Sequence, residues 1–376
     1  MIHRLLCLLL LWLSGASLAT ADERLHYPAR EMDGEAPGRL VIHGALDPTY
    51  ARPILADFHA RYPTIDLTYR NLDTLPLYRR FLEAPGEVDV LMSSAMPWQY
   101  RLANDGHAQP LNTPEARAWP AWARWRRELF AVTFEPIVMV VRRELIERFG
   151  RPASHADLLA LLQRHPEVLR GRVVTYDPNV SGAGYGYAIE ESRLSPRYWD
   201  LIAAFGATDT ALAATTGEML EGLIDGRFWL GYNLLGSYAR EVVERHPGLE
   251  MVVPDDYTLV TQRLALIPRQ APHPDEARRF MDFLIGKAGQ QVIARETSLG
   301  AVHPALTGPG TAWALRSSHG DALRPVTLGP GLLATLDDLK RQALLTRWQR
   351  EFTRHQASLA PTASQDDATR PADARQ

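Results

Sequence analysis

The part of this sequence best suited to binding chemistry is a glycine-bearing loop near the middle of the chain. An apolar run at residues 173–176 leads through a Pro-Asn turn to Ser-Gly-Ala-Gly at 181–184, and helical spacing follows from residue 185. A helix that begins at such a loop presents unpaired backbone N–H groups and the positive end of its dipole, so it can bind an anion without a lysine. Ser181 can donate to that ligand or cap the helix. The alternative is an ordinary strand–helix turn, in which Ser181 is only a cap and the glycines only permit the backbone geometry.

Polar loops also follow four other segments that we expect to be strands or crossings. In open α/β sheets, ligands bind in the crevice at the carboxyl ends of the strands. Each loop alone could be a simple turn or cap, but four of them in register with the glycine loop favour convergence on one cleft. The candidate ligand-binding residues are Ala45, Leu46, Asp47, Ser93, Ser94, Ala95, Ser181, Gly182, Ala183, Gly184, Tyr185, Tyr232, Asn233, Asp256 and Tyr257.

Tyrosines and arginines could complete such a cleft. A tyrosine offers an apolar ring with a polar end. We expect some of the following to line the cleft and the others to pack half-buried: Tyr176, Tyr185, Tyr187, Tyr232 and Tyr257. Positive charge for an anionic ligand could come from Arg70, Arg79, Arg80 and Arg263, although a solvated surface position is the default expectation for each.

The elements that must position these residues alternate between strand and helix. This alternation implies parallel sheets with helices on both faces, and therefore an α/β fold. The expected strands are residues 40–43, 65–70, 88–92, 173–176, 228–232, 249–253 and 259–268. The expected helices are residues 49–62, 75–82, 157–162, 198–205, 216–224, 236–245, 274–285 and 289–296, with one or two more within 331–352.

The length of the chain predicts two lobes. A chain of 376 residues is too long for a single hydrophobic core. Two extended segments, residues 130–141 and 251–268, are longer than an ordinary strand. Each contains residues that interrupt a regular strand, Glu135-Pro136 in the first and a turn at 254–257 in the second. Such segments could cross between two α/β lobes as a hinge. The alternative is two sequential domains with ordinary strands.

The two ends of the chain indicate export. Residues 1–21 combine Arg4, an apolar run and an A-x-A cleavage signal that ends at Ala21, which is typical of a secretory signal peptide. The one cysteine, Cys7, lies inside this leader, so the mature chain has no disulfide, and a bacterial periplasmic protein is the simplest interpretation. Residues 361–376 are polar and expected to be disordered. A net charge of −3 argues against nucleic acid as a partner.

The sequence carries no enzyme signature that we recognise. It lacks the G-x-S-x-G, H-E-x-x-H and G-x-x-x-x-G-K-[ST] motifs, and its histidines are scattered without ligand spacing. We therefore expect no metal site, no cofactor and no catalysis. An exported phosphatase or esterase is the remaining enzymatic alternative, and it would need a nucleophile–base pair or a metal site.

Several motifs taken together resemble a known family. They are Leu-Val-Ile-His-Gly at 40–44, the segment 88–95, Phe-Glu-Pro at 134–136, the segments 171–178 and 181–185, Thr-Gly-Glu-Met-Leu-Glu-Gly at 216–222, residues 231–238, and a helix at 277–290. Over residues 38–350 the chain is similar to bacterial extracellular solute-binding proteins of ABC transporters with the type 2 periplasmic-binding fold. It is most similar to the branch of ferric-ion binders, hexose-phosphate binders and the phosphoglycerate transport regulatory protein.

This resemblance implies two lobes, each a mixed sheet flanked by helices, joined by a two-strand hinge and closing on a ligand. It implies a first lobe of residues 38–133 and 257–352 and a second lobe of residues 134–256. Ferric members carry two adjacent tyrosines in the region of 231–238, where this chain has Tyr232-Asn233, so iron is not expected. The serine–glycine loops favour a small organic anion instead, either a phosphorylated sugar or glycerate or a carboxylate.

The expected partner of the liganded protein is an inner-membrane ABC permease. The alternative is the periplasmic domain of a two-component sensor kinase, which could bind the same ligand-loaded shape. We expect a monomer.

Overall fold

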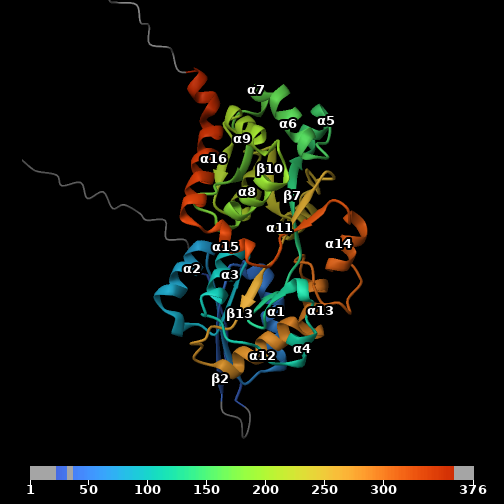
Figure 1. Ribbon diagram of the computed structural model, residues 1–376. Helices are drawn as coiled ribbons and strands as arrows, with labels where there is room; N and C mark the ends of the chain where they lie inside the picture. Colours follow the sequence, from blue (N-terminus) through green and yellow to red (C-terminus); the bar gives the residue numbers. More distant parts are fainter. Residues whose placement is uncertain (1–22, 32–36, 360–376) are drawn as a thin grey trace, which may run out of the picture.

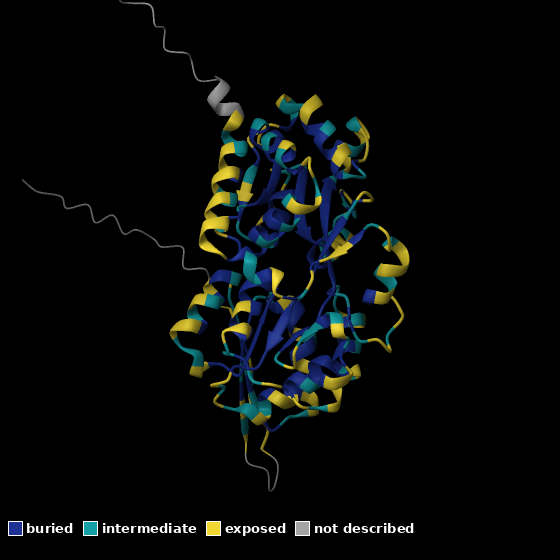
Figure 2. Cartoon of the chain, viewed as in Figure 1, coloured by how far each residue is buried: buried dark blue, intermediate teal, exposed yellow. Residues whose placement is uncertain are grey.

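The computed structural model describes residues 23–31 and 37–359 and contains two lobes, each built on a mixed sheet (Figure 1). The expected signal peptide at 1–21 and the expected disordered tail at 361–376 lie outside the described residues. Within the described ranges, no helix is both long and apolar enough to cross a bilayer. The buried residues follow the two sheets, and the helices carry the exposed ones (Figure 2).

The first lobe is built on one seven-stranded sheet. Its strand order is β1 (Arg24–Tyr27), β3 (Ile65–Asn71), β2 (Gly38–Gly44), β4 (Val90–Ser93), β13 (Leu264–Leu266), β6 (Leu129–Ala131) and β5 (Arg124–Trp125). Strand β2 pairs in parallel with β3 and β4, whereas β13 runs antiparallel to β4 and β6. The helices of this lobe, with two short 3-10 turns, are α1 (Pro48–Arg61), α2 (Thr74–Glu83), η1 (Pro85–Glu87), α3 (Met96–Asn104), α4 (Pro114–Ala118) and η2 (Ala121–Ala123), and, after β13, α12 (Pro274–Ile285) and α13 (Lys287–Glu296).

The second lobe is built on the other seven-stranded sheet. Its order is β14 (Leu323–Pro325), β12 (Thr258–Thr261), β7 (Glu135–Arg142), β10 (Leu230–Leu235), β8 (Val173–Tyr176) and β9 (Ala211–Ala213), and β11 (Leu249–Val252) also pairs with β7. The helices along this part of the chain are α5 (Arg143–Phe149), α6 (His155–Arg164), α7 (Pro166–Leu169), α8 (Gly182–Leu194), α9 (Tyr198–Ala207), α10 (Thr216–Ile224) and α11 (Gly236–Arg245). After β13 the chain also forms α14 (Ala312–His319), α15 (Gly331–Thr335) and α16 (Asp338–Leu359).

Two extended segments cross between the lobes, as the sequence predicts. The chain leaves the first sheet at β6 and enters the second at β7, and it returns from β12 to β13. The two crossings are hydrogen-bonded to each other, because the Val132 N–H donates to the Arg263 carbonyl at 2.9 Å and the Arg263 N–H donates to Thr133 Oγ1 at 2.9 Å. Each long segment is therefore two strands in two sheets, joined at a two-strand hinge.

The C-terminal part of the chain differs from the expectation that residues 257–352 belong to the first lobe. Strands β12 and β14 pair within the second sheet, and α16 packs along α9 at the edge of the second lobe (Figure 1). The reason is apolar burial, since Trp348 of α16 is buried in the core of the second lobe. The short helix α15 packs instead against α3 of the first lobe. The C-terminal segment thus contacts both lobes.

Candidate ligand-binding cavity

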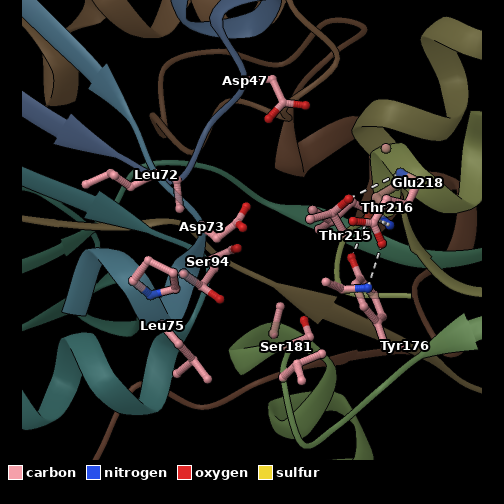
Figure 3. Close-up of a pocket in the computed structure, with 18 of the residues that line it drawn as sticks. Asp47, Leu72, Asp73, Leu75, Ser94, Tyr176, Ser181, Thr215, Thr216 and Glu218 are labelled. Atoms are coloured by element: carbon pink, nitrogen blue, oxygen red, sulfur yellow. Dashed lines mark hydrogen bonds between the residues drawn. The ribbon is translucent and has the colours of Figure 1, made fainter. Parts of the chain in front are cut away.

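A cavity of about 530 Å³ lies where loops of the two lobes face each other (Figure 3). The first lobe contributes loops that follow β2, β3 and β4, and the second lobe contributes loops that follow β8, β9 and β10. The crossing residue Arg263 also lines the cavity. The cavity therefore lies at the strand ends of both sheets, where an open α/β fold binds its ligands.

Five helices of eight or more residues begin at this cavity, because the N-cap residue of each one lines it. The N-caps of α1 and α2 in the first lobe are Asp47 and Asp73, and those of α8, α10 and α11 in the second lobe are Ser181, Thr215 and Leu235. A helix start carries partial positive charge and N–H groups without intrahelical partners. The backbone itself therefore makes this cavity attractive to an anion.

The N-caps in the two lobes differ in chemistry. Ser181 Oγ accepts from the Gly184 N–H at 3.1 Å, and Thr215 Oγ1 accepts from the Glu218 N–H at 3.2 Å. These caps are neutral, so α8 keeps the positive end of its dipole uncompensated. Asp47 and Asp73 carry carboxylates that make no side-chain capping bond to their own helices. Among the helix N-caps that line the cavity, the two acidic ones therefore belong to the first lobe.

Arg263 brings a formal positive charge to the hinge side of the cavity. Its side chain is 1 % exposed, its Nε lies 3.2 Å from Glu135 Oε1, and its Nη1 donates to the Ala45 carbonyl. Burial alone lowers the pKa of Arg263, but the Glu135 carboxylate, together with smaller contributions from Tyr238, Tyr69 and Asp47, outweighs burial and raises that pKa above its ordinary value, so the guanidinium is charged. Nε and Nη2 are both buried and have no hydrogen-bond partner among the described residues, although Nε lies beside the Glu135 carboxylate. A buried donor without a partner is costly, so Nη2 of this cavity-lining residue lacks an acceptor that a ligand could supply.

Two buried tyrosines complete the walls near Arg263. The Tyr238 hydroxyl accepts from the Asp47 N–H at 3.1 Å and so links the two lobes, and Tyr176 Oη lies 2.5 Å from Thr216 Oγ1. Burial raises the pKa of both tyrosines, so both hydroxyls remain protonated at neutral pH. Neutral hydroxyls can donate to a bound acceptor without adding charge.

Four carboxylates and two guanidinium groups line the cavity: those of Asp47, Asp73, Glu218, Glu221, Arg79 and Arg263. Burial raises the pKa of Asp47, and nearby Arg263 opposes that rise. Burial also raises the pKa of Asp73, and the charge of Glu218 on the opposite lobe adds to this effect. Glu218 accepts from the Ala214 N–H at 2.8 Å. The lining is therefore polar and holds more acidic than basic groups.

Five of the candidate residues from the sequence line the cavity: Ala45, Asp47, Ser94, Ser181 and Ala183. Four others lie directly behind these residues. The Leu46 carbonyl accepts from the Tyr69 hydroxyl at 2.5 Å, and Ser93 Oγ accepts from the Ala95 N–H at 3.2 Å. The Gly184 N–H is taken by Ser181. These groups position the cavity wall, and their own polar atoms bond within the protein.

Gly182 and Tyr185 lie at a contact between the lobes. A Cβ at Gly182 would meet Thr74 Oγ1 at 3.0 Å and Leu75 Cδ2 at 3.1 Å, so a larger residue would have to displace these side chains by a few tenths of an ångström, and glycine fits the close approach of α8 to α2 without that shift. The Tyr185 ring packs edge-on against Trp98 of α3, and its hydroxyl donates to the Thr335 carbonyl. The glycine loop thus brings the lobes together beside the cavity.

The other four candidates, Tyr232, Asn233, Asp256 and Tyr257, lie away from the cavity in the second lobe. The Tyr232 hydroxyl donates to Glu191 Oε1 at 2.7 Å, and Asn233 Nδ2 donates to Glu191 Oε2 at 3.0 Å. Strand β10 has a register shift between Gly231 and Leu234, where it pairs with β7, and Asn233 has a φ of 66°. At this irregularity the Tyr232 side chain is buried in the core of the second lobe. The expectation that Tyr232 and Asn233 close a wall of the cleft therefore does not match the structure.

Asp256 and Tyr257 bind a buried histidine of the same cluster. His155 Nδ1 lies 2.8 Å from Asp256 Oδ1, and the Tyr257 ring stacks on the imidazole with centroids 3.9 Å apart. Glu191 Oε1 lies 3.6 Å from His155 Nε2. These contacts join the loop after β11 to the start of α6, which is a structural role. We assign no ligand contact to either residue.

The sequence interpretation missed several lining residues, and some carried a usable signal. Thr215 followed by Glu218 has the S/T-x-x-E pattern of a capping box before a helix, and it comes directly after a strand. Asp73 precedes α2 at the end of a strand in the same way. No local pattern marks Tyr238, which lines the cavity from the first turn of α11. Over the described chain, no group of three or more His, Cys, Asp and Glu side chains could hold a metal ion.

Comparison with known proteins identifies the family. The family model for bacterial extracellular solute-binding proteins matches residues 39–296. A crystal structure of the substrate-binding protein of an ABC transporter from Agrobacterium tumefaciens is 36% identical, covers 88% of this chain and 98% of its own, and superposes with a TM-score of 0.84. No curated protein sequence matches.

More distant structures share the fold. The fructose-6-phosphate-bound AfuA from Actinobacillus pleuropneumoniae is 17% identical, covers 84% of this chain and 99% of its own, and has a TM-score of 0.68. The iron-bound HitA from Pseudomonas aeruginosa is 18% identical with the same coverages and a TM-score of 0.66. At these identities the likeness concerns the fold alone. The family match and the Agrobacterium relative together establish that this chain belongs to the bacterial extracellular solute-binding proteins.

Proposed function

We propose that this chain is a periplasmic binding protein that captures a small organic anion between its two lobes and delivers it to an ABC permease. The observation that carries the proposal is the buried guanidinium group of Arg263, which lines the cavity: its Nε lies beside Glu135, and its Nη2 has no acceptor among the described residues. A ligand oxyanion at Nη2 would form a charge-assisted hydrogen bond, which is roughly twice as strong as a neutral one.

The second lobe supplies further donors to the same oxyanion. Ser181 and Ala183 at the start of α8 and the hydroxyl of Tyr176 line the cavity together with Arg263. Ser94 faces them from the first lobe. Donors from both lobes would favour the closed arrangement only when a ligand fills the cavity, which couples binding to lobe closure.

The proposed solute class includes phosphate esters and carboxylates. The relative of this fold from Actinobacillus pleuropneumoniae was solved with fructose-6-phosphate, which makes sugar phosphates an obvious first set of probes. Ferric ion is a contrasting probe because HitA, another protein of this fold, was solved with iron. The adjacent Tyr-Tyr pair of ferric binders is replaced here by Tyr232-Asn233, and Tyr232 is buried against Glu191.

Delivery to a permease is supported by the Agrobacterium relative, which is a substrate-binding protein of an ABC transporter. The family and the expected signal peptide support a periplasmic location for the mature protein. Among the described residues that line the cavity, we assign no nucleophile–base pair. One structure of this fold is described as a two-component signalling protein at 16% identity, which concerns the fold alone, so transport remains our proposal.

The test is a thermal-shift screen of the purified mature protein. The panel contains sugar phosphates, phosphoglycerates, di- and tricarboxylates, aminoalkyl phosphates, polyamines and ferric ion. A ligand that binds only the native state raises the melting temperature by mass action, by an amount that grows with its concentration. We expect stabilisation by at least one organic anion. Stabilisation by ferric ion or a polyamine alone would contradict the proposal.

A further inference from the structure

The charges around the cavity are unbalanced for a ligand that is purely anionic. Four carboxylates line it against two guanidinium groups. One of these guanidiniums, that of Arg263, is already paired with Glu135, and both side chains of the pair are essentially inaccessible to solvent. The other, Arg79, is exposed to solvent, where its field is screened, and the carboxylates of Asp73, Glu218 and Glu221 are exposed as well. A ligand that carried only negative charge would therefore enter a cavity that already holds more acidic than basic groups.

The acidic groups lie on both sides of the gap between the lobes. Asp73 belongs to the loop that ends β3 in the first lobe, and Glu218 belongs to the first turn of α10 in the second lobe (Figure 3). The two carboxylates are close enough for the charge of Glu218 to raise the pKa of Asp73. Like charges from opposite lobes oppose closure unless a positive group lies between them.

The two kinds of group therefore require opposite partners within one cavity. The unpartnered Nη2 of buried Arg263 requires an acceptor, and the facing carboxylates of Asp73 and Glu218 require a donor with positive charge. The cavity, at about 530 Å³, has room for both ends of a small molecule. From this juxtaposition we infer that the solute is a zwitterion, with its anionic group at Arg263 and an ammonium group between Asp73 and Glu218.

This inference rests on the proposed function and narrows its substrate class. A hydroxyl group could also donate to a carboxylate, but it would leave the charges of Asp73 and Glu218 uncompensated across the gap. An ammonium group donates hydrogen bonds and also removes the repulsion between the two carboxylates. Closure would then depend on both ends of the solute.

The test compares matched phosphate monoesters by isothermal titration calorimetry at one salt concentration. The probes are 2-aminoethyl phosphate, propyl phosphate, in which a methyl replaces the ammonium, and 2-hydroxyethyl phosphate. A parallel set uses β-alanine and butyrate for a carboxylate end. The variant is Asp73→Asn with Glu218→Gln, which removes both charges and keeps the side-chain shapes and the oxygen of residue 218 that accepts from the Ala214 N–H. The matched control is Asp275→Asn with Glu167→Gln, which neutralises two exposed carboxylates outside the cavity.

We expect the wild type and the control to bind the aminoalkyl anion at least tenfold more tightly than its alkyl counterpart in one of the two sets. The Asp73/Glu218 variant should lose this preference and bind the alkyl anion no more weakly than the wild type does. Equal affinity for both members, or preference for the hydroxyalkyl phosphate, would overturn the zwitterion while leaving the proposed function intact. If no anion of either set or of the screen binds, both fail.

Discussion

A valine at Gly182 should weaken ligand binding by preventing the lobes from approaching each other. In the structure, a Cβ at this position would lie 3.0 Å from Thr74 Oγ1, 3.1 Å from Leu75 Cδ2 and 3.3 Å from the Ala95 Cβ, all in the first lobe. The two methyl groups of valine extend beyond that Cβ. They can be accommodated only if α8 moves away from α2 and α3.

The magnitude follows from the cost of overpacking. Inserting extra carbon atoms into a filled contact typically costs about 1–3 kcal/mol. Because the lobes can relieve the overlap by separating, we expect this cost to fall on closure and hence on affinity, with little effect on unfolding of either lobe. At about 1.4 kcal/mol for each factor of ten, the dissociation constant should rise by roughly 5- to 150-fold.

The matched control is the same substitution one turn further along α8. A Cβ at Gly186 would have no neighbour within 4 Å, so Gly186→Val should leave affinity unchanged. The assay is calorimetric titration with the anion that gives the largest thermal shift, together with the melting temperature of each unliganded variant. Unchanged affinity in Gly182→Val, or an equal loss in Gly186→Val, would refute the idea that this lobe contact accompanies binding.

Two further predictions concern stability. Although burial alone lowers the pKa of His155, its hydrogen bond with Asp256 and the nearby Glu191 carboxylate raise that pKa from 6.5 to about 9. The resulting stabilisation, about 3 kcal/mol, is fully present below pH 6.5 and is lost as the pH rises through 9. Urea unfolding midpoints should therefore fall between pH 7 and 9.5, and His155→Gln should flatten that decline; a midpoint that rises with pH would count against the charged histidine. In Gly206→Ala, the new methyl would overlap the Phe352 backbone carbonyl and displace α16. Tryptophan emission should then shift to longer wavelength as Trp348 becomes exposed, and an unshifted spectrum would show that α16 stays docked.

Local signals in the sequence were sufficient for the fold class and for part of the cleft. Strand–helix alternation and the capping residues before helices depend only on residues that are close in sequence. They can therefore be recognised without the tertiary structure. The loop at Ser181 and the residues Asp47 and Ser94 were placed by the rule that ligands bind at strand ends, and all three line the cavity. The two crossings were likewise visible as extended segments that were too long for one strand.

What could not be predicted depends on contacts between distant residues. The register shift of β10 between Gly231 and Leu234 changes the side of the sheet on which Tyr232 lies. A prediction that assumes regular alternation of the two faces of a strand cannot include such a shift. The burial of Arg263 depends on Glu135, more than a hundred positions earlier in the chain. Likewise, α16 follows the second lobe because Trp348 fits its core. The general expectation that an arginine lies at the solvent-exposed surface is wrong when a carboxylate from a distant part of the chain compensates its charge.

The most direct test of the central claim measures anion affinity after the charge of Arg263 is removed without leaving its partner ion unpaired. The double variant Arg263→Met with Glu135→Gln achieves this, whereas Glu135→Gln alone retains the guanidinium and serves as the control. A lost charge-assisted hydrogen bond of about 1.5–3 kcal/mol predicts a roughly 10- to 150-fold weaker binding of the anion to the folded double variant, with the single variant at least as tight as the wild type. Equal affinity of the double variant and the wild type for that anion would contradict the account.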